Sequence, residues 1–155
     1  MSSSQQTQVT TRAFARVIGP FLIILTSTAV ARASAMPTLL TEFRANSVWP
    51  WVTGAFILLT GLIVVALHQY WRGAPAIIVS VLGWLTVLKG FSLLALPQAY
   101  LSFASTAVDA VTWWRAGFLA MALVGLYLTF IGWAPAPKRT AAQPARPAPD
   151  VRRAA

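Results

Sequence analysis

The chain has 155 residues, of which 57% are hydrophobic and only 10% charged, and its formal net charge is +9. A water-soluble domain of this size buries too small a fraction of its surface to hide so much apolar area. The sequence contains no cysteine and a single histidine, His68, which excludes disulfide frameworks, thiolate metal ligands, cysteine nucleophiles and a conventional zinc site. We therefore expect a membrane protein without metal or cofactor.

Four apolar stretches fill most of the chain, at about residues 15–33, 51–70, 76–96 and 117–133. Each has close to the ~20 residues that carry an α-helix across a hydrocarbon core. Because lipid offers no water to backbone N–H and C=O groups, such stretches must be helices, and the alternation of a barrel strand is absent. The sequence predicts an all-α bundle of four transmembrane helices over 15–133. Residues 1–14 and the basic Ala/Pro/Arg-rich tail, 134–155, are predicted to be disordered.

The basic residues predict the orientation of the bundle. They gather before the first stretch, at Arg72 in the short second connection, and after the last stretch. The positive-inside rule then places both termini and the Arg72 turn in the cytoplasm. The tail would attract anionic lipid headgroups. No folded basic module is present to read nucleic acid.

The first stretch has a rival interpretation as a signal peptide, with Ala33-Ser34-Ala35 as the cleavage site. Cleavage would leave three spans and would move the basic tail across the membrane, against the charge bias. We therefore favour a retained first span.

The connections and span ends suggest an internal repeat. Short interfacial helices are predicted after Pro37 and after Pro97, and Asn46 or Ser47 can cap the second span. The segment 51–54 (Trp-Val-Thr-Gly) resembles 114–117 (Trp-Arg-Ala-Gly). We interpret this pattern as two tandem helical hairpins. Aromatic residues at the span ends fit the belts that form at membrane interfaces.

Lys89 is the one charged residue near the middle of an apolar stretch, where a charge costs about 3 kcal/mol and indicates function or pairing. At ~100° per residue its side of the helix should face other helices, and that side also carries Leu82, Gly83, Thr86, Gly90 and Leu93. Glu42 and Asp109, in the two outer connections, are its available counter-charges. We interpret Lys89 first as a structural residue, paired with one of these carboxylates or with helix-end carbonyls. Binding of an anionic ligand or lipid headgroup, and snorkelling to the interface, stay open.

His68 closes the second stretch, where it can titrate near neutrality or hydrogen-bond within the bundle. Five residues therefore form the candidate polar cluster, functional or structural: Lys89, His68, Glu42, Asp109 and Thr86. Glycines on the helix faces are candidates for close helix packing. They are Gly54, Gly61, Gly83, Gly90, Gly117 and Gly125.

The segment Ala66-Leu-His-Gln-Tyr-Trp71, followed by Gly83-Trp84, Lys89-Gly90 and Pro97, resembles a family of small four-span bacterial inner-membrane proteins of unknown function. Members share a His-x-x-Trp segment followed by Gly-Trp, Lys-Gly and Pro. They commonly have asparagine after the histidine, where this chain has Gln69. The resemblance implies four spans and a place in a bacterial inner (plasma) membrane. It draws attention to His68, Trp84 and Lys89, but it implies no activity.

Two classes of function remain. The favoured one is a non-enzymatic accessory or interaction subunit, binding a copy of itself or a larger membrane complex. The alternative is a small transporter or channel for an anionic solute that uses the Lys89 face. Paired carboxylates, a phosphate-binding glycine loop and a plausible Ser-His-Asp set are absent from the sequence, so we do not expect an enzyme. No span contains a carboxylate, and the small multidrug transporters rely on a glutamate in their first span.

Overall fold

The computed structural model describes the backbone of residues 3–134, and their side chains except those of 3–7 and 109. Its elements are α1 (Ser3–Ala31), the single turn Ala33–Ala35, α2 (Met36–Ala45), α3 (Val48–Leu67), α4 (Ala74–Ala95), α5 (Pro97–Asp109) and α6 (Val111–Trp133). Four of the helices, α1, α3, α4 and α6, are long and apolar enough to cross a membrane. The prediction of an all-α bundle with four membrane-spanning helices is confirmed.

The bounds of all four spans differ from those predicted, most of all at the starts of α1 and α6, and α3 ends at Leu67, one residue before His68. Helix α1 begins at Ser3, so residues 3–14 are helical where the sequence suggested disorder. Within this segment Thr11 is buried and hydrogen-bonded to His68, a tertiary contact that favours an ordered helix where propensity is weak. Helix α6 begins at Val111, well before residue 117, because tryptophans that suit the interface extend the apolar core by almost two turns. Beyond Ala134 the predicted disordered tail lies outside the described residues.

Local sequence signals set the helix starts. Proline occupies the first turn of α2, α4 and α5, where its missing N–H costs no helical hydrogen bond. Before α3, the Asn46 side-chain oxygen accepts the backbone N–H of Val48 at 3.0 Å. Gly73 lies at φ 88°, a left-handed conformation that ends the tight turn between α3 and α4. The helices predicted after Pro37 and Pro97 are therefore α2 and α5.

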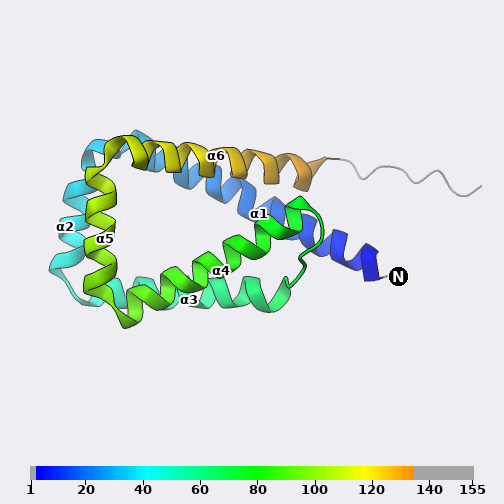
Figure 1. Cartoon of the computed structure of the whole chain (residues 1–155), viewed down its shortest axis with the longest axis horizontal. Coiled ribbons are helices and arrows are strands. Elements are labelled where there is room, and N and C mark those ends of the chain that lie inside the picture. Colours follow the sequence, from blue (N-terminus) through cyan, green and yellow to red (C-terminus); the bar gives the residue numbers. More distant parts are fainter. Residues whose placement is uncertain (1–2, 135–155) are drawn as a thin grey trace, which may run out of the picture.

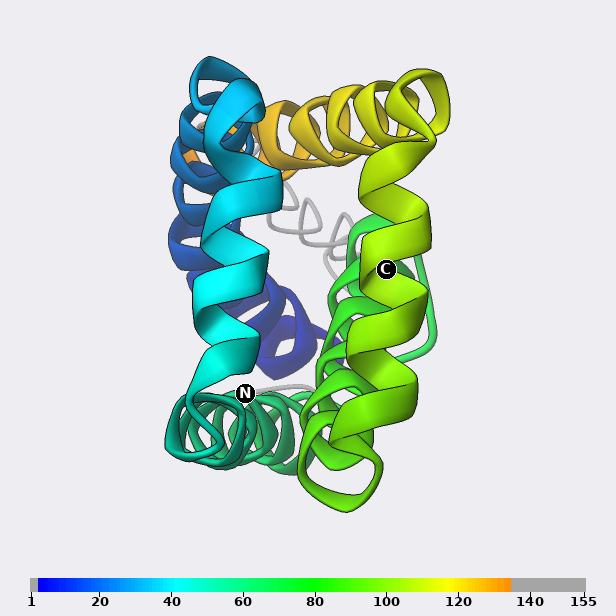
Figure 2. The ribbon, with the colours of Figure 1, turned by 90° about the vertical axis from the view of Figure 1, so that its left-hand side faces the viewer.

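The long helices form two antiparallel pairs, α1 with α6 and α3 with α4 (Figure 1). Helices α2 and α5 lie side by side across one end of both pairs, hereafter the α2–α5 end (Figure 2). The start of α1, the end of α6 and the α3–α4 turn lie at the opposite end, hereafter the terminal end (Figure 1). Both ends of the described chain are thus on the same side of the bundle.

The long helices pack on different partners from those that the predicted repeat suggested. The two expected hairpins would pack the first span on the second and the third on the fourth, but the main contacts join α1 to α6 and α3 to α4. Each half of the chain has the form long helix, short helix, long helix. The first long helix of each half packs on the last long helix of the other half, so the halves interlock (Figure 2).

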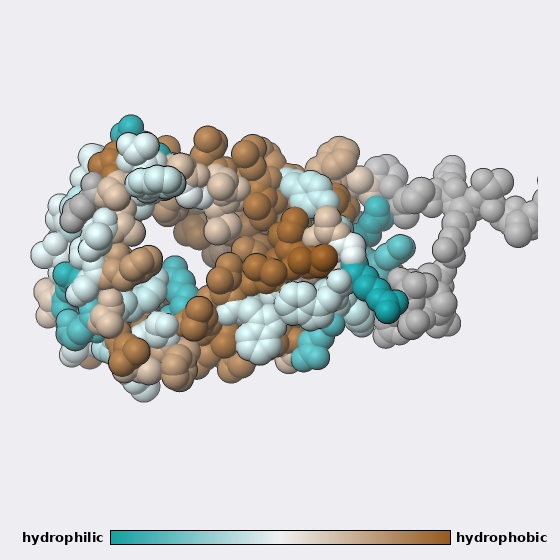
Figure 3. Space-filling model, in the orientation of Figure 1, coloured by the Kyte–Doolittle hydropathy of each residue, from teal (hydrophilic) through white to brown (hydrophobic). Residues whose placement is uncertain are grey.

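The two pairs meet chiefly near the terminal end, through α1 and α4. Buried Ala15 and Leu22 of α1, Val79 of α4 and Leu128 of α6 form one core cluster there. Towards the α2–α5 end the pairs separate, and the space-filling view shows an opening between them (Figure 3). The bundle is closed at one end and open between its pairs at the other.

Candidate functional site

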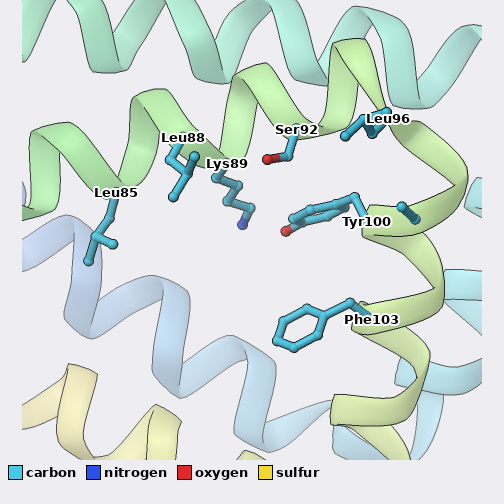
Figure 4. A pocket seen from close by; sticks show the side chains of 8 residues that line it. Leu85, Leu88, Lys89, Ser92, Leu96, Tyr100 and Phe103 are labelled. Atoms are coloured by element: carbon cyan, nitrogen blue, oxygen red, sulfur yellow. The ribbon is translucent and has the colours of Figure 1, made fainter.

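Lys89 lines an open cavity of about 410 Å³ between α4 and α5. Its side chain is exposed and points away from α4 into the space between the helix pairs (Figure 4). Other residues on the helix face predicted for Lys89 are buried, unlike Lys89 itself: Gly83, Gly90 and Leu93 of α4 lie in helix contacts. Lys89 therefore lies at the edge of the packing face and does not join it.

The lining of this cavity changes in polarity along α4. Leu85 and Leu88 lie on the side of Lys89 towards the terminal end, and Ser92 lies on the side towards α5. From α5, Tyr100 directs its hydroxyl towards the Lys89 ammonium (Figure 4). The remaining lining residues are apolar: Leu96, Ala99 and Phe103. One cation and two hydroxyls are thus held among hydrocarbon walls.

The structure does not gather the predicted polar cluster. Glu42 is exposed on α2, and it makes no ion pair with Lys89 or any other described side chain. Thr86 donates to the carbonyl of Leu82 at 2.7 Å, within its own helix, and does not line the Lys89 cavity. Asp109 is the last residue of α5, and its side chain is not among those described. The interpretation of Lys89 as a partner of Glu42 is wrong, and its pairing with Asp109 stays a prediction.

His68 lies at the other end of the molecule, in a buried hydrogen-bonded cluster. It is 1% exposed, and its ring nitrogens contact two hydroxyls: Nε2 lies 3.0 Å from Thr11 Oγ1, and Nδ1 lies 3.2 Å from Ser80 Oγ. The rings of Phe14 and Tyr70 contact the imidazole edge-on. The cluster joins α1, the end of α3 and α4, and so links the two helix pairs. The interpretation of His68 as a residue hydrogen-bonded within the bundle agrees with this geometry.

The hydrogen-bond network assigns the proton on the imidazole. The Ser80 hydroxyl donates to the carbonyl of Tyr70 at 2.9 Å, so its oxygen is left to accept from His68 Nδ1–H. Nε2 then accepts from the Thr11 hydroxyl. His68 follows the last residue of α3, outside the membrane-spanning segment, and burial lowers its pKa below the ordinary 6.5. A neutral imidazole fits a site without an acidic partner.

Arg16 of α1 contacts the end of α6, an interaction that the sequence did not reveal. Its Nε donates to the carbonyl of Gly132 at 2.8 Å, and its guanidinium lies over the ring of Trp133, 5.8 Å from the centroid. A cation at the end of α6 complements the exposed carbonyls and the negative end of the helix dipole. Arg16 therefore fastens α1 to α6 at the terminal end.

Five of the six predicted packing glycines lie in tight helix contacts. A Cβ at Gly61 would come within 2.6 Å of the Val87 backbone nitrogen, and one at Gly90 would meet the Leu58 backbone. Gly54 and Gly83 also lie in the α3–α4 contact, where their nearest neighbours are side-chain atoms of Leu94 and Val64, and Gly125 packs against α1. Gly117 is the exception, because a Cβ there would meet nothing within 4 Å. The prediction that Gly117 packs against another helix is wrong within the described bundle.

No protein-family model, curated protein or solved structure matches the chain. The resemblance to small four-span inner-membrane proteins thus stays a prediction. Among the side chains that the structure describes, which exclude that of Asp109, no group of three or more His, Asp or Glu residues comes together.

Proposed function

We propose that this protein is a multi-pass protein of the bacterial inner membrane, with both termini cytoplasmic, that acts by binding within the bilayer as an accessory or interaction subunit. The observation that carries the proposal is the difference between the ends of the bundle. An open, apolar-walled space is available for binding at one end, while a packed core occupies the other.

The packed core argues against conduction. A solute route through a bundle needs a continuous polar lining. Between the pairs at the terminal end lie Ala15, Leu22 and Val79, with Val64, Ile78 and Leu82 packed against them. The polar groups nearby, His68 and Ser80, are bonded to each other and to the backbone. This arrangement supports a binding protein over a channel.

The glycine contacts also bear on the kind of partner. Close-packing glycines often form the contact between separate membrane proteins, but here Gly61, Gly90 and Gly125 are already occupied by helices of the same chain. A partner would therefore meet lipid-facing side chains, many of them large and apolar, such as Phe56 and Phe130.

Cross-linking in native membranes tests the proposal. A photo-reactive amino acid at exposed Phe130 should give a discrete adduct with a membrane protein after irradiation, because that side chain is 74% exposed. The same amino acid at buried Leu128 is the control and should give adducts only within the chain. Adducts with lipid alone, at Phe130 and across the other exposed positions, would contradict the interaction role.

A transporter for an anionic solute is the second candidate, favoured by the exposed ammonium of Lys89 in its cavity. Reconstituted protein tests it. If liposomes containing the protein pass chloride or phosphate and the Lys89→Met variant does not, the accessory-subunit proposal fails. We expect no flux above that of empty liposomes for either protein.

A further inference from the structure

We propose that the Lys89 cavity binds the anionic phosphate headgroup of a membrane phospholipid, with an acyl chain lying against Leu85 and Leu88. This inference rests on the proposed binding role and names the class of ligand. The order of side chains along the cavity, its depth and its lateral opening carry the argument.

The polar groups of the cavity form an anion-binding set. The Lys89 ammonium carries three donors, and the hydroxyls of Ser92 and Tyr100 add one each. All three side chains end in the same space (Figure 4). None of them is hydrogen-bonded or ion-paired to another described residue. A phosphodiester offers several acceptor oxygens and a negative charge, which satisfies several donors at once.

The depth of Lys89 matches a headgroup at the edge of the bilayer. From Lys89 to Ala95, the last residue of α4, the helix rises about 9 Å. A lysine stem of four carbons places the ammonium nearer still to the α2–α5 end. A soluble anion would have to leave water and enter apolar surroundings, whereas a lipid headgroup already lies at that level.

The apolar part of the cavity accounts for the rest of the ligand. Leu85 lies about one helical turn from Lys89 towards the terminal end, and its side chain points into the same space (Figure 4). The opening between the helix pairs leads sideways out of the bundle (Figure 3). A phospholipid could therefore enter from the bilayer, because its chain never has to cross a polar barrier. An inorganic anion would leave these walls unused.

Native mass spectrometry of the full chain in detergent tests the proposal. Added phosphatidylglycerol should be retained by the wild-type protein in a 1:1 adduct, and phosphatidylcholine, whose headgroup is zwitterionic, should be retained more weakly. Lys89→Met should weaken retention of phosphatidylglycerol about tenfold or more, since a hydrogen-bonded charge is lost. Lys89→Arg should restore most of it.

Matched variants separate the site from general effects. Arg115→Met removes a cation that is exposed at the α2–α5 end but lines no part of the cavity, so it should leave retention within twofold of wild type. Ala99→Phe keeps Lys89 but fills the cavity and should weaken retention. Ala95→Phe, at an exposed position outside the cavity, is its control.

The inference is overturned if the wild-type protein retains no phosphatidylglycerol, or if Lys89→Met and Ala99→Phe retain it as wild type does. It is also overturned if millimolar inorganic phosphate displaces the lipid, because the site would then serve a soluble anion. The outcomes remain distinct from those of the proposed function. Anion flux would reject the accessory role and leave lipid binding standing. A cross-linked partner without lipid retention would support the accessory role and reject lipid binding.

Discussion

The two ends of the bundle differ in how the helix pairs are joined. At the terminal end the helix pairs are joined by an apolar core and by the buried His68, whose hydrogen bonds reach α1 and α4. At the α2–α5 end the pairs stand apart, spanned by two short helices, and Lys89 faces the space between them. A buried polar side chain with partners holds helices together, and an exposed one without partners is available to a ligand. The predictions below test this contrast, from the largest expected effect to the smallest.

His68→Ala should cause the largest loss of stability. The substitution leaves the hydroxyls of Thr11 and Ser80 without the imidazole and opens a cavity between the helix pairs. We expect the free energy of unfolding to fall by about 2–4 kcal/mol. Titration with a denaturing detergent, followed by circular dichroism, measures it. A change below about 0.5 kcal/mol would mean that the terminal end is not held together through His68.

Gly90→Ala should destabilise the α3–α4 contact. The added methyl group meets the Leu58 backbone, which cannot rotate away as a side chain can, so we expect a loss of about 1–3 kcal/mol. Gly117→Ala is the matched control, because its new methyl group enters open space, and no loss is expected. Equal melting temperatures for the two variants would show that the close contact between α3 and α4 is not formed.

Acidification should weaken the terminal end. Burial lowers the pKa of His68 in the folded protein below 6.5, so the unfolded chain takes up a proton first as pH falls. Stability is therefore complete above pH 6.5 and decreases from that pH down to the folded-state pKa. Thermal unfolding between pH 8 and pH 5 measures the decrease. His68→Asn, which cannot titrate, should flatten this part of the profile; an unchanged profile in that variant would assign the decrease to other groups.

Lys89→Met should scarcely change stability, by less than about 0.5 kcal/mol in either direction. The ammonium has no described partner to lose, and methionine keeps most of the apolar stem. The same unfolding measurement as for His68→Ala allows direct comparison. A loss as large as that of His68→Ala would show that Lys89 holds helices together and would remove the contrast between the ends.

The four long helices were predictable because a membrane span is a continuous run of apolar residues, which the sequence shows directly. The partners of each helix were not, since each of the four is apolar around most of its surface and a one-dimensional pattern does not choose among them. Thr11 and His68 are separated by 57 residues, and Thr11 belongs to a segment too polar to suggest a span. The Lys89 site was missed in part because Tyr100 and Phe103 come from α5, whose position over α4 depends on the whole fold.

The interlocked pairing has a consequence for the order in which the protein is made. Helices α3 and α4 are neighbours in the chain and can pair as soon as both have left the ribosome. Of the described helices, α1 emerges before all the others, yet its partner α6 follows all of them. During synthesis α1 must stay in the bilayer with the face that packs against Gly125 of α6 unpaired. A nascent chain stopped before Val111 would therefore expose an unpaired helix face by which membrane quality control can recognise it.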